Sequence, residues 1–388
     1  MSELRNSEGW GRMASTSSTD VAVTTTSASR SGYIDLLRAA AIARVVVYHT
    51  VGWAWLTVAF PAMGLMFALG GSLMAASLDR YGRTAVVRRV RRILPPVWLI
   101  GAAALAAMTA RGGFGVSWRW VLWLVPVDDP PVSEWAAPAL GILWYVRSYL
   151  WFVLLSPLLL PLFRRRPTAS VLVPFGVLVG LATLGQDTGG VVRDFFLYLP
   201  MWLIGFAHHD RLLERIPARL LWPVVAVLGA VGLTLLYRAP GPRGYDLNDA
   251  PVADVPWSVA VLLVLLALVP RLRRPRRRGE PFWPVVPLRV ARGRHPTRQR
   301  LSGRLGAALR AVNHRALTIY LWHQAAIWLV ATAVEPWLPG GTPARLGAVL
   351  VILATAVATF GWVEDVAAGR RPAILPDRWH GEPSRAAA

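Results

Sequence analysis

Long runs of apolar residues constrain this chain more than any other feature of its sequence. A membrane-spanning helix needs about 20 mostly apolar residues, and lipid admits only helices and closed barrels because it cannot satisfy exposed backbone groups. The pattern therefore predicts an all-α, polytopic integral membrane protein with about ten spanning helices. The runs lie near residues 33–59, 61–78, 93–110, 139–163, 168–186, 194–208, 219–237, 256–270, 316–334 and 345–363.

The composition agrees with a membrane protein. Hydrophobic residues make up 55% of the 388 residues and charged residues only 16%, whereas soluble domains average about 25% charged. The net charge of +21 could indicate nucleic acid, but every basic residue is an arginine, and the arginines sit mainly in short loops between apolar runs. That arrangement is typical of membrane topology, so no nucleic-acid partner is expected. The absence of cysteine excludes disulfides and thiolate metal sites.

The arginines also predict an orientation. With the N-terminus inside, the inside segments hold 33 arginines, the outside loops hold 6, and 3 lie within spans. Cytoplasmic loops carry an excess of basic residues, so the chain is predicted to be N-in and C-in. The long 271–315 loop supplies 14 of the inside arginines, and the asymmetry survives its removal.

The domain organisation follows from these segments. Residues 1–31 are rich in Ser and Thr and are predicted to form a disordered cytoplasmic tail. Residues 32–366 form the transmembrane domain, and residues 367–388 form a second cytoplasmic tail. The basic loop 271–315 is expected to contact anionic membrane lipids.

Two ionisable residues stand out in the first span. Charged residues at membrane depth cost about 2.5–3.5 kcal/mol on insertion scales, so each is a candidate for function. Arg38 and His49 are eleven residues apart, which places them on one helix face, roughly 16 Å apart along the axis. Arg38, near the cytoplasmic end, could hold an anion, and His49, deeper in the span, could move protons. Alternatively, Arg38 is a topology anchor and His49 an interhelical hydrogen-bonding group. Asp35 has the spacing to pair with Arg38.

An arginine cluster precedes the third span. Arg88, Arg89 and Arg92 fall within the run Arg88–Pro96 at its cytoplasmic mouth. Arginine binds phosphate through two parallel donors, so the cluster could hold a phosphorylated ligand. For a bare arginine run, however, a positive-inside topology signal is the favoured explanation.

Later spans contain weaker candidates. Tyr320 and His323 lie in the ninth span, where His323 is either a site residue or a hydrogen-bonded core residue. Trp144, Arg147 and Tyr149 lie in the fourth span, and Arg147 is predicted to face the bundle interior. No metal site is expected, because no His, Asp or Glu pair has ligand spacing on one helix and the adjacent His208 and His209 face different directions.

Taken in order, these motifs resemble the membrane-bound acyltransferase-3 family, bacterial O-acyltransferases that modify surface polysaccharides, lipids and antibiotics. The family's Arg-x10-His motif is matched by Arg38 and His49, and its Tyr-Leu-x-His motif by Tyr320 to His323. Glu364 resembles a family glutamate at the end of the last span. The other matched motifs are Phe67 to Gly71, Arg88 to Pro95, Leu143 to Tyr145 and Pro200 to Gly205. The chain departs from the family at Gly70, where a serine is usual, and at Tyr149, where one branch has a glutamate.

The resemblance implies roles for these residues. His49 is the expected general base, acting with Arg38, and Arg88, Arg89 and Arg92 are expected to hold the donor, acyl-CoA. Lower-ranked substrate-binding candidates are Asp35, Trp144, Arg147, Tyr320, His323 and Glu364. It further implies that no cofactor is bound, that the acceptor is a carbohydrate, glycolipid or glycosylated metabolite, and that the protein resides in the inner (plasma) membrane.

A different class of protein could use the same residues. A transporter or exporter of a polar or lipid-linked glycan would also place charges inside the membrane along its substrate path. Turnover of acyl-CoA by the purified protein separates the two, because a transporter gives none. A non-catalytic scaffold leaves the intramembrane charges unexplained.

Overall fold

A computed structural model describes residues 19–373 apart from 113–114, 116, 126–127, 186–188, 269–303 and 338–339. Within these ranges the chain is helical and has no strand, only an isolated bridge between Gly241 and Gly244. Several α-helices run into short 3-10 or π turns, as α11 does at Val264–Leu268 and α14 at Val330–Val334. The α-helices are α1 (Thr19–Val51), α2 (Trp55–Ala59), α3 (Ala62–Tyr81), α4 (Thr84–Arg111), α5 (Ala137–Leu140), α6 (Leu143–Arg165), α7 (Pro167–Thr183), α8 (Gly189–His209), α9 (Leu212–Arg215), α10 (Ala218–Arg238), α11 (Pro251–Leu263), α13 (Arg304–His314), α14 (Ala316–Leu329), α15 (Gly341–Phe360) and α16 (Trp362–Ala367).

Many of these helices are long and apolar enough to cross a membrane. Seven segments of the described chain meet both criteria: Trp55–Tyr81, Thr84–Arg111, Ala137–Arg165, Gly190–His209, Ala218–Arg238, Ala316–Trp337 and Gly341–Phe360. Two shorter apolar helices, Pro167–Thr183 and Pro251–Ala267, also occur. The prediction of an all-α, polytopic membrane protein is thus confirmed. The count of ten spans and the N-in/C-in orientation stay predictions.

The first helix differs from its predicted boundaries at both ends. It begins at Thr19, so the part of the N-terminal tail from Thr19 onward is helical and not disordered. It ends at Val51, because Gly52 adopts a φ of +72°, and the chain turns before the short helix α2. The single span predicted over 33–59 is therefore wrong, since Trp55–Ala59 belongs with α3. Of the predicted 271–315 loop, Arg304–His314 forms α13, and residues 271–303 lie outside the described residues.

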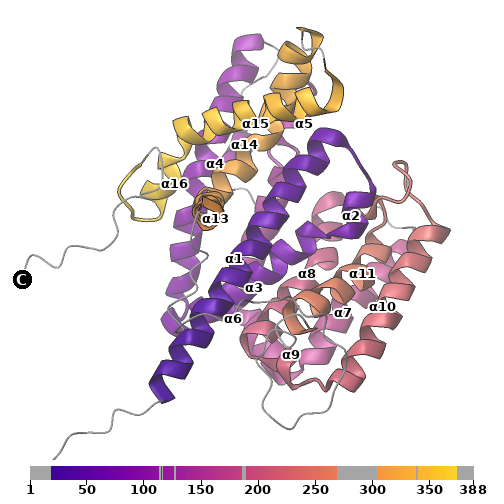
Figure 1. Ribbon diagram of the computed structural model, residues 1–388. Coiled ribbons are helices and arrows are strands. Elements are labelled where there is room, and N and C mark those ends of the chain that lie inside the picture. Colours follow the sequence, from indigo (N-terminus) through magenta and orange to yellow (C-terminus); the bar gives the residue numbers. More distant parts are fainter. Residues whose placement is uncertain are drawn as a thin grey trace, which may run out of the picture.

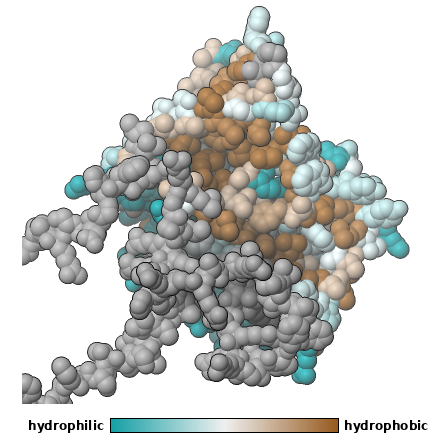
Figure 2. Space-filling model, in the orientation of Figure 1, coloured by the Kyte–Doolittle hydropathy of each residue, from teal (hydrophilic) through white to brown (hydrophobic). Residues whose placement is uncertain are grey.

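The helices form a bundle around α1 and α3. Helix α1 runs diagonally across the front of the molecule, with α7 to α11 on one side and α4 and α13 to α16 on the other (Figure 1). It contacts α3, α13, α14 and α15. On the uncovered part of the same face, hydrophobic residues gather over the middle and hydrophilic ones lie mainly at the rim (Figure 2). Such a hydrophobic face suits contact with lipid tails.

Helices α3 and α8 approach unusually closely through two glycines. A Cβ atom on Gly71 would lie 2.2 Å from the carbonyl oxygen of Trp202, and one on Gly205 would lie 2.1 Å from that of Ala68. Small residues allow such backbone contact between membrane helices. Gly71 and Gly205 thus allow α3 and α8 to pack backbone against backbone.

Candidate functional site

A cavity of about 820 Å³ opens at the end of the bundle where α3 ends and α4 begins. Its volume falls within the roughly 300–1,000 Å³ that is usual for sites of small ligands. Residues of α1, α3, α4, α6, α8, α13, α14 and α16 line it, and those with charged side chains are Asp35, Arg38, Arg88, Arg89, Arg92 and Glu364. Residues far apart in the sequence thus meet in one cavity.

Helix α4 delivers three of the four cavity arginines. It begins at Thr84, earlier than the predicted span at 93, so the arginine run forms its first turns and not a loop before it. Residues three and four apart share a helix face, which is why Arg88 and Arg92, and Arg89 and Arg92, can face one cavity.

The four arginines fall into two groups. Arg89 is held in place: it donates to the Tyr149 hydroxyl at 2.6 Å, and to the Leu73 carbonyl and the Ser77 hydroxyl at 3.2 Å each. Arg38, Arg88 and Arg92 make no hydrogen bond or ion pair with any described residue, although Arg88 lies over the Tyr81 ring at 4.3 Å. Three guanidinium groups in the cavity thus make no direct bond to an anionic group, although the Glu364 carboxyl interacts electrostatically with Arg92.

The two cavity carboxyl groups do not neutralise them. Asp35 lines the cavity but makes no ion pair with Arg38 within the described structure, so the pairing its spacing allows does not occur. Glu364 is buried and accepts hydrogen bonds from the Thr318 hydroxyl at 2.9 Å and backbone N–H at 3.2 Å. Burial raises the pKa of the Glu364 carboxyl, although the Thr318 hydrogen bonds oppose this. Glu364 therefore offsets the positive charge of the cavity less than a solvated carboxylate would.

The inner end of the cavity is aromatic. Tyr145, Tyr149 and Tyr320 line it, and the rings of Tyr145 and Tyr320 lie 4.8 Å apart. The Tyr320 hydroxyl donates to the Ile142 carbonyl at 2.9 Å, which fixes α14 against α6. Next to this layer, Gly70 leaves room for the rings of Tyr149 and Trp202, each of which would lie 2.9 Å from an added Cβ.

His49 and His323 lie outside the cavity but contact each other. Neither residue lines it, so Arg38 and His49 do not share one chamber despite lying on one helix. His49 is exposed in the last turn of α1. His323 is fully buried on α14, with its ring 5.5 Å from Tyr320 and 5.3 Å from His49. The two histidines thus lie next to the tyrosine rings, with His323 in contact with Tyr320 and His49 in contact with His323.

Two weaker candidates lie elsewhere. Arg147 is buried, as predicted, but both Asp129 and Asp194 pair with it, and it does not line the cavity. Trp144 stacks on Tyr198 at 5.3 Å and is also absent from the cavity wall. Both residues therefore contribute to the helix bundle and not to the cavity.

The end of α1 is tied to the loop between α10 and α11. The Tyr48 hydroxyl donates to the carboxylate of Asp246 at 2.5 Å and accepts from Arg243 at 2.7 Å. Asp246 is fully buried, and it also accepts from the Asn248 backbone N–H at 2.9 Å. Because Tyr48 directly precedes His49, this loop holds the turn of α1 that carries the imidazole.

We expect Tyr48→Phe to destabilise the protein. The change removes a hydrogen bond to a buried carboxylate, a type of bond that contributes about 1.5–3 kcal/mol. A lower melting temperature of the purified protein in detergent checks this. Tyr237→Phe is the control, because Tyr237 is exposed and makes no hydrogen bond within the described residues. Equal melting temperatures for the two variants would contradict the importance of the Tyr48 contact.

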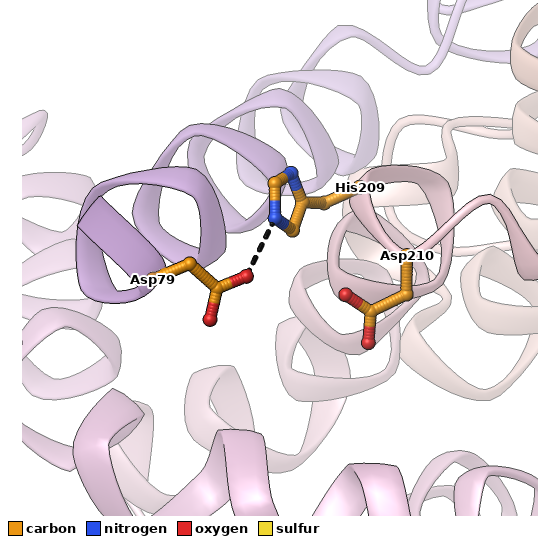
Figure 3. A group of neighbouring side chains, drawn as sticks. All are labelled: Asp79, His209 and Asp210. Atoms are coloured by element: carbon orange, nitrogen blue, oxygen red, sulfur yellow. Dashed lines mark hydrogen bonds and ion pairs between the residues drawn. The ribbon is translucent and has the colours of Figure 1, made fainter.

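A second polar cluster lies where α3, α6 and α8 end. Asp79, His209 and Asp210 place possible metal-ligand atoms within 4.8 Å of one another (Figure 3). The sequence analysis looked for ligand pairs on one helix. It therefore did not predict this group, in which Asp79 of α3 meets His209 and Asp210 at the end of α8. However, Arg164 donates to both carboxylates, at 2.7–2.9 Å. A guanidinium group thus already supplies the positive charge, and the cluster ties the helix ends together.

Sequence reasoning missed some cavity residues. Ser72 and His208 form a hydrogen bond of 2.9 Å in the cavity wall. Tyr149 was named among the fourth-span candidates, and it lines the cavity and holds Arg89 there. Asn313 also lines the cavity, and it falls within the loop predicted to contact lipid.

The comparison with protein families decides the identity. A family model for the acyltransferase domain, acyltransferase-3, matches residues 31–363. The chain belongs to the acyltransferase-3 family. It is therefore a multi-pass membrane acyltransferase. No curated protein and no solved structure gives a significant match to the acyltransferase.

Proposed function

We propose that this acyltransferase transfers an acetyl or other short acyl group from acyl-CoA to a hydroxyl of a carbohydrate, glycolipid or glycosylated metabolite. The observation that supports it most directly is the set of unpaired guanidinium groups of Arg38, Arg88 and Arg92 in one cavity. The phosphates of CoA match this set, because arginine binds phosphate through paired donors. Acyl-CoA is consumed as a substrate, and no bound cofactor is needed.

The donor enters from the cytoplasm of a cell whose inner membrane holds the protein. The cavity is at the end of the bundle that carries the arginine run of α4, and such runs favour the cytoplasmic side. The nucleotide end of CoA lies among Arg38, Arg88 and Arg92, while Arg89, held by Tyr149, keeps a fixed charge beside it.

His49 acts as the general base in the transfer. It takes the proton of the acceptor hydroxyl as the oxygen attacks the thioester carbon, a role that contributes about 10²- to 10⁴-fold to rates. Tyr320 and His323 lie between His49 and the cavity. The acyl end of the donor therefore has to extend past the tyrosine rings to reach His49. Holding both substrates there supplies the orientation that transfer needs.

The double change Arg88→Gln and Arg92→Gln is expected to weaken donor binding. Charge-assisted hydrogen bonds contribute about 1.5–3 kcal/mol each, so we expect the KM for acetyl-CoA to rise at least about tenfold. The kcat at saturating donor should change little, since these contacts are equal in the ground and transition states. Steady-state kinetics of the purified protein measure both quantities.

Arg91→Gln is the matched control. Arg91 belongs to the same arginine run and is exposed, but it does not line the cavity. Its KM should stay at the wild-type value. An unchanged KM in the double variant, or an equal rise in Arg91→Gln, would refute the donor site.

A further inference from the structure

The hydrogen bonding of His323 fixes which of its ring nitrogens carries a proton. Nδ1 lies 2.6 Å from the carbonyl oxygen of Tyr320. A carbonyl oxygen can only accept, so Nδ1 carries the hydrogen and the neutral ring keeps a lone pair on Nε2. That Nε2 atom is buried and has no hydrogen-bond partner among the described residues. A buried acceptor without a partner costs about 1–3 kcal/mol, so its presence calls for an explanation.

His49 is placed to supply the missing donor. The two rings lie 5.3 Å apart between centroids and are tilted by 43°. Two imidazoles joined by an N–H···N hydrogen bond of about 2.9 Å have ring centres roughly 5 Å apart. His49 is exposed, so its side chain can rotate to complete the bond. The Tyr320 ring packs against His323 at 5.5 Å and keeps the acceptor in place.

We propose that His323 is a positioning residue that accepts the ring N–H of His49 at Nε2 and so makes the other nitrogen of His49 the base. This inference rests on the proposed function and adds the group that orients its base. A base oriented by a third group is the arrangement that activates nucleophiles in hydrolytic triads. His323, with its tautomer set by the Tyr320 carbonyl, supplies the acceptor that a carboxylate supplies there.

The acyl-transfer step balances in bonds and protons without a further reactant. The acceptor O–H bond breaks, its proton passes to the free nitrogen of His49, and its oxygen forms the ester bond with the acyl carbon. The C–S bond breaks and the sulfur leaves as a thiolate. The thiolate then takes the proton from His49, which yields CoA with a free thiol. His323 stays neutral and keeps its hydrogen bond to His49 throughout.

The kinetic test compares two substitutions of His323 in the full-length protein. His323→Leu removes the acceptor, and we expect kcat to fall about 10- to 100-fold, as for other residues that orient a functional histidine. The KM for acetyl-CoA should stay at the wild-type value, because His323 does not line the cavity. His323→Gln keeps an acceptor oxygen near Nε2 and should recover most of the kcat. A raised KM, or equal losses in the Leu and Gln variants, would overturn the proposal.

Two further comparisons exclude a merely structural role. If His323 acts only through His49, adding His323→Leu to His49→Ala should cause no further loss of rate, whereas additive losses contradict the proposal. Ile327→Val is the fold control, because Ile327 is buried one turn further along α14 in an apolar cluster with Val46 and Val330 and has no polar group. If His323→Leu does not fold, His323→Phe replaces it in the test, because phenylalanine fills the same space without an acceptor atom. We expect the same fall in kcat for this variant.

A readout without turnover separates this inference from the proposed function. In ¹⁵N-histidine NMR of the wild-type protein, His49 should show one tautomer, and in His323→Leu it should show a mixture of both. An unchanged His49 spectrum in His323→Leu overturns the orienting role, even with turnover intact. A single tautomer that becomes mixed in His323→Leu, in a protein that turns over no acyl-CoA, would refute the proposed function and leave the hydrogen bond standing.

Discussion

The variant His49→Ala should lose most of its acyl transfer and keep its donor binding. Removal of a general base costs about 10²- to 10⁴-fold in rate, and we expect kcat to fall by that amount. The affinity for acetyl-CoA should stay at the wild-type value, because His49 does not line the cavity that holds the arginines. Isothermal titration with acetyl-CoA measures the second quantity and product formation in membranes the first.

His314→Gln is the matched control for this change. His314 is also a histidine, but it lies outside the cavity and pairs with Asp365 at 3.4 Å. Its transfer rate should equal that of the wild type. Acylation at the wild-type rate in His49→Ala, with normal protein abundance, would remove His49 from the mechanism.

The variant Gly205→Ala should lose most of its stability. The added Cβ would lie 2.1 Å from the Ala68 carbonyl oxygen and 2.7 Å from the Ser72 backbone nitrogen. Both are backbone atoms, so α3 and α8 would have to separate. Overpacking lowers the free energy of unfolding by about 1–3 kcal/mol and occasionally more. We expect a loss of about 3 kcal/mol or more here, because the added Cβ would clash with two backbone atoms at once. The melting temperature and the folded yield in detergent measure the loss.

The control for this prediction is Gly176→Ala in α7. Gly176 lies inside a helix, and nothing lies within 4 Å of its added Cβ. Alanine is the better helix former by about 1 kcal/mol, so this variant should be as stable as the wild type or more so. Similar losses in both variants would show that glycine replacement as such, and not the contact between α3 and α8, causes the effect.

The sequence predicts the class of fold and the residue types of the cavity for one physical reason. Lipid makes polar groups costly, so apolar runs mark helices and rare charges mark candidate sites. Arg38, Arg88 and Arg92 were found in this way and do line the cavity. Gly205 was matched only as part of a family motif, and the structure gives its physical reason, the close approach of α8 to α3.

Other features depend on contacts between distant residues and could not be predicted. Burying the charge of Arg147 in a membrane costs as much free energy as burying that of Arg38. Asp194, 47 residues away in the sequence, offsets this cost by pairing with Arg147. Hydropathy continues past Gly52 into Trp53 and Trp55, so it could not show that α1 ends there. His49 and His323 were each named as candidates, but their contact joins two helices that no spacing rule relates.

Turnover of acyl-CoA by the purified protein distinguishes an acyltransferase from a transporter. Radiolabelled acetyl-CoA is incubated with the protein in detergent together with a membrane extract as a source of acceptor, and free CoA and labelled product are measured. We expect the wild type to release CoA and to transfer the label, at rates that fall in the Arg88→Gln, Arg92→Gln double variant at limiting donor. Release of CoA no faster than without protein would refute the proposed acyl transfer and favour a transporter.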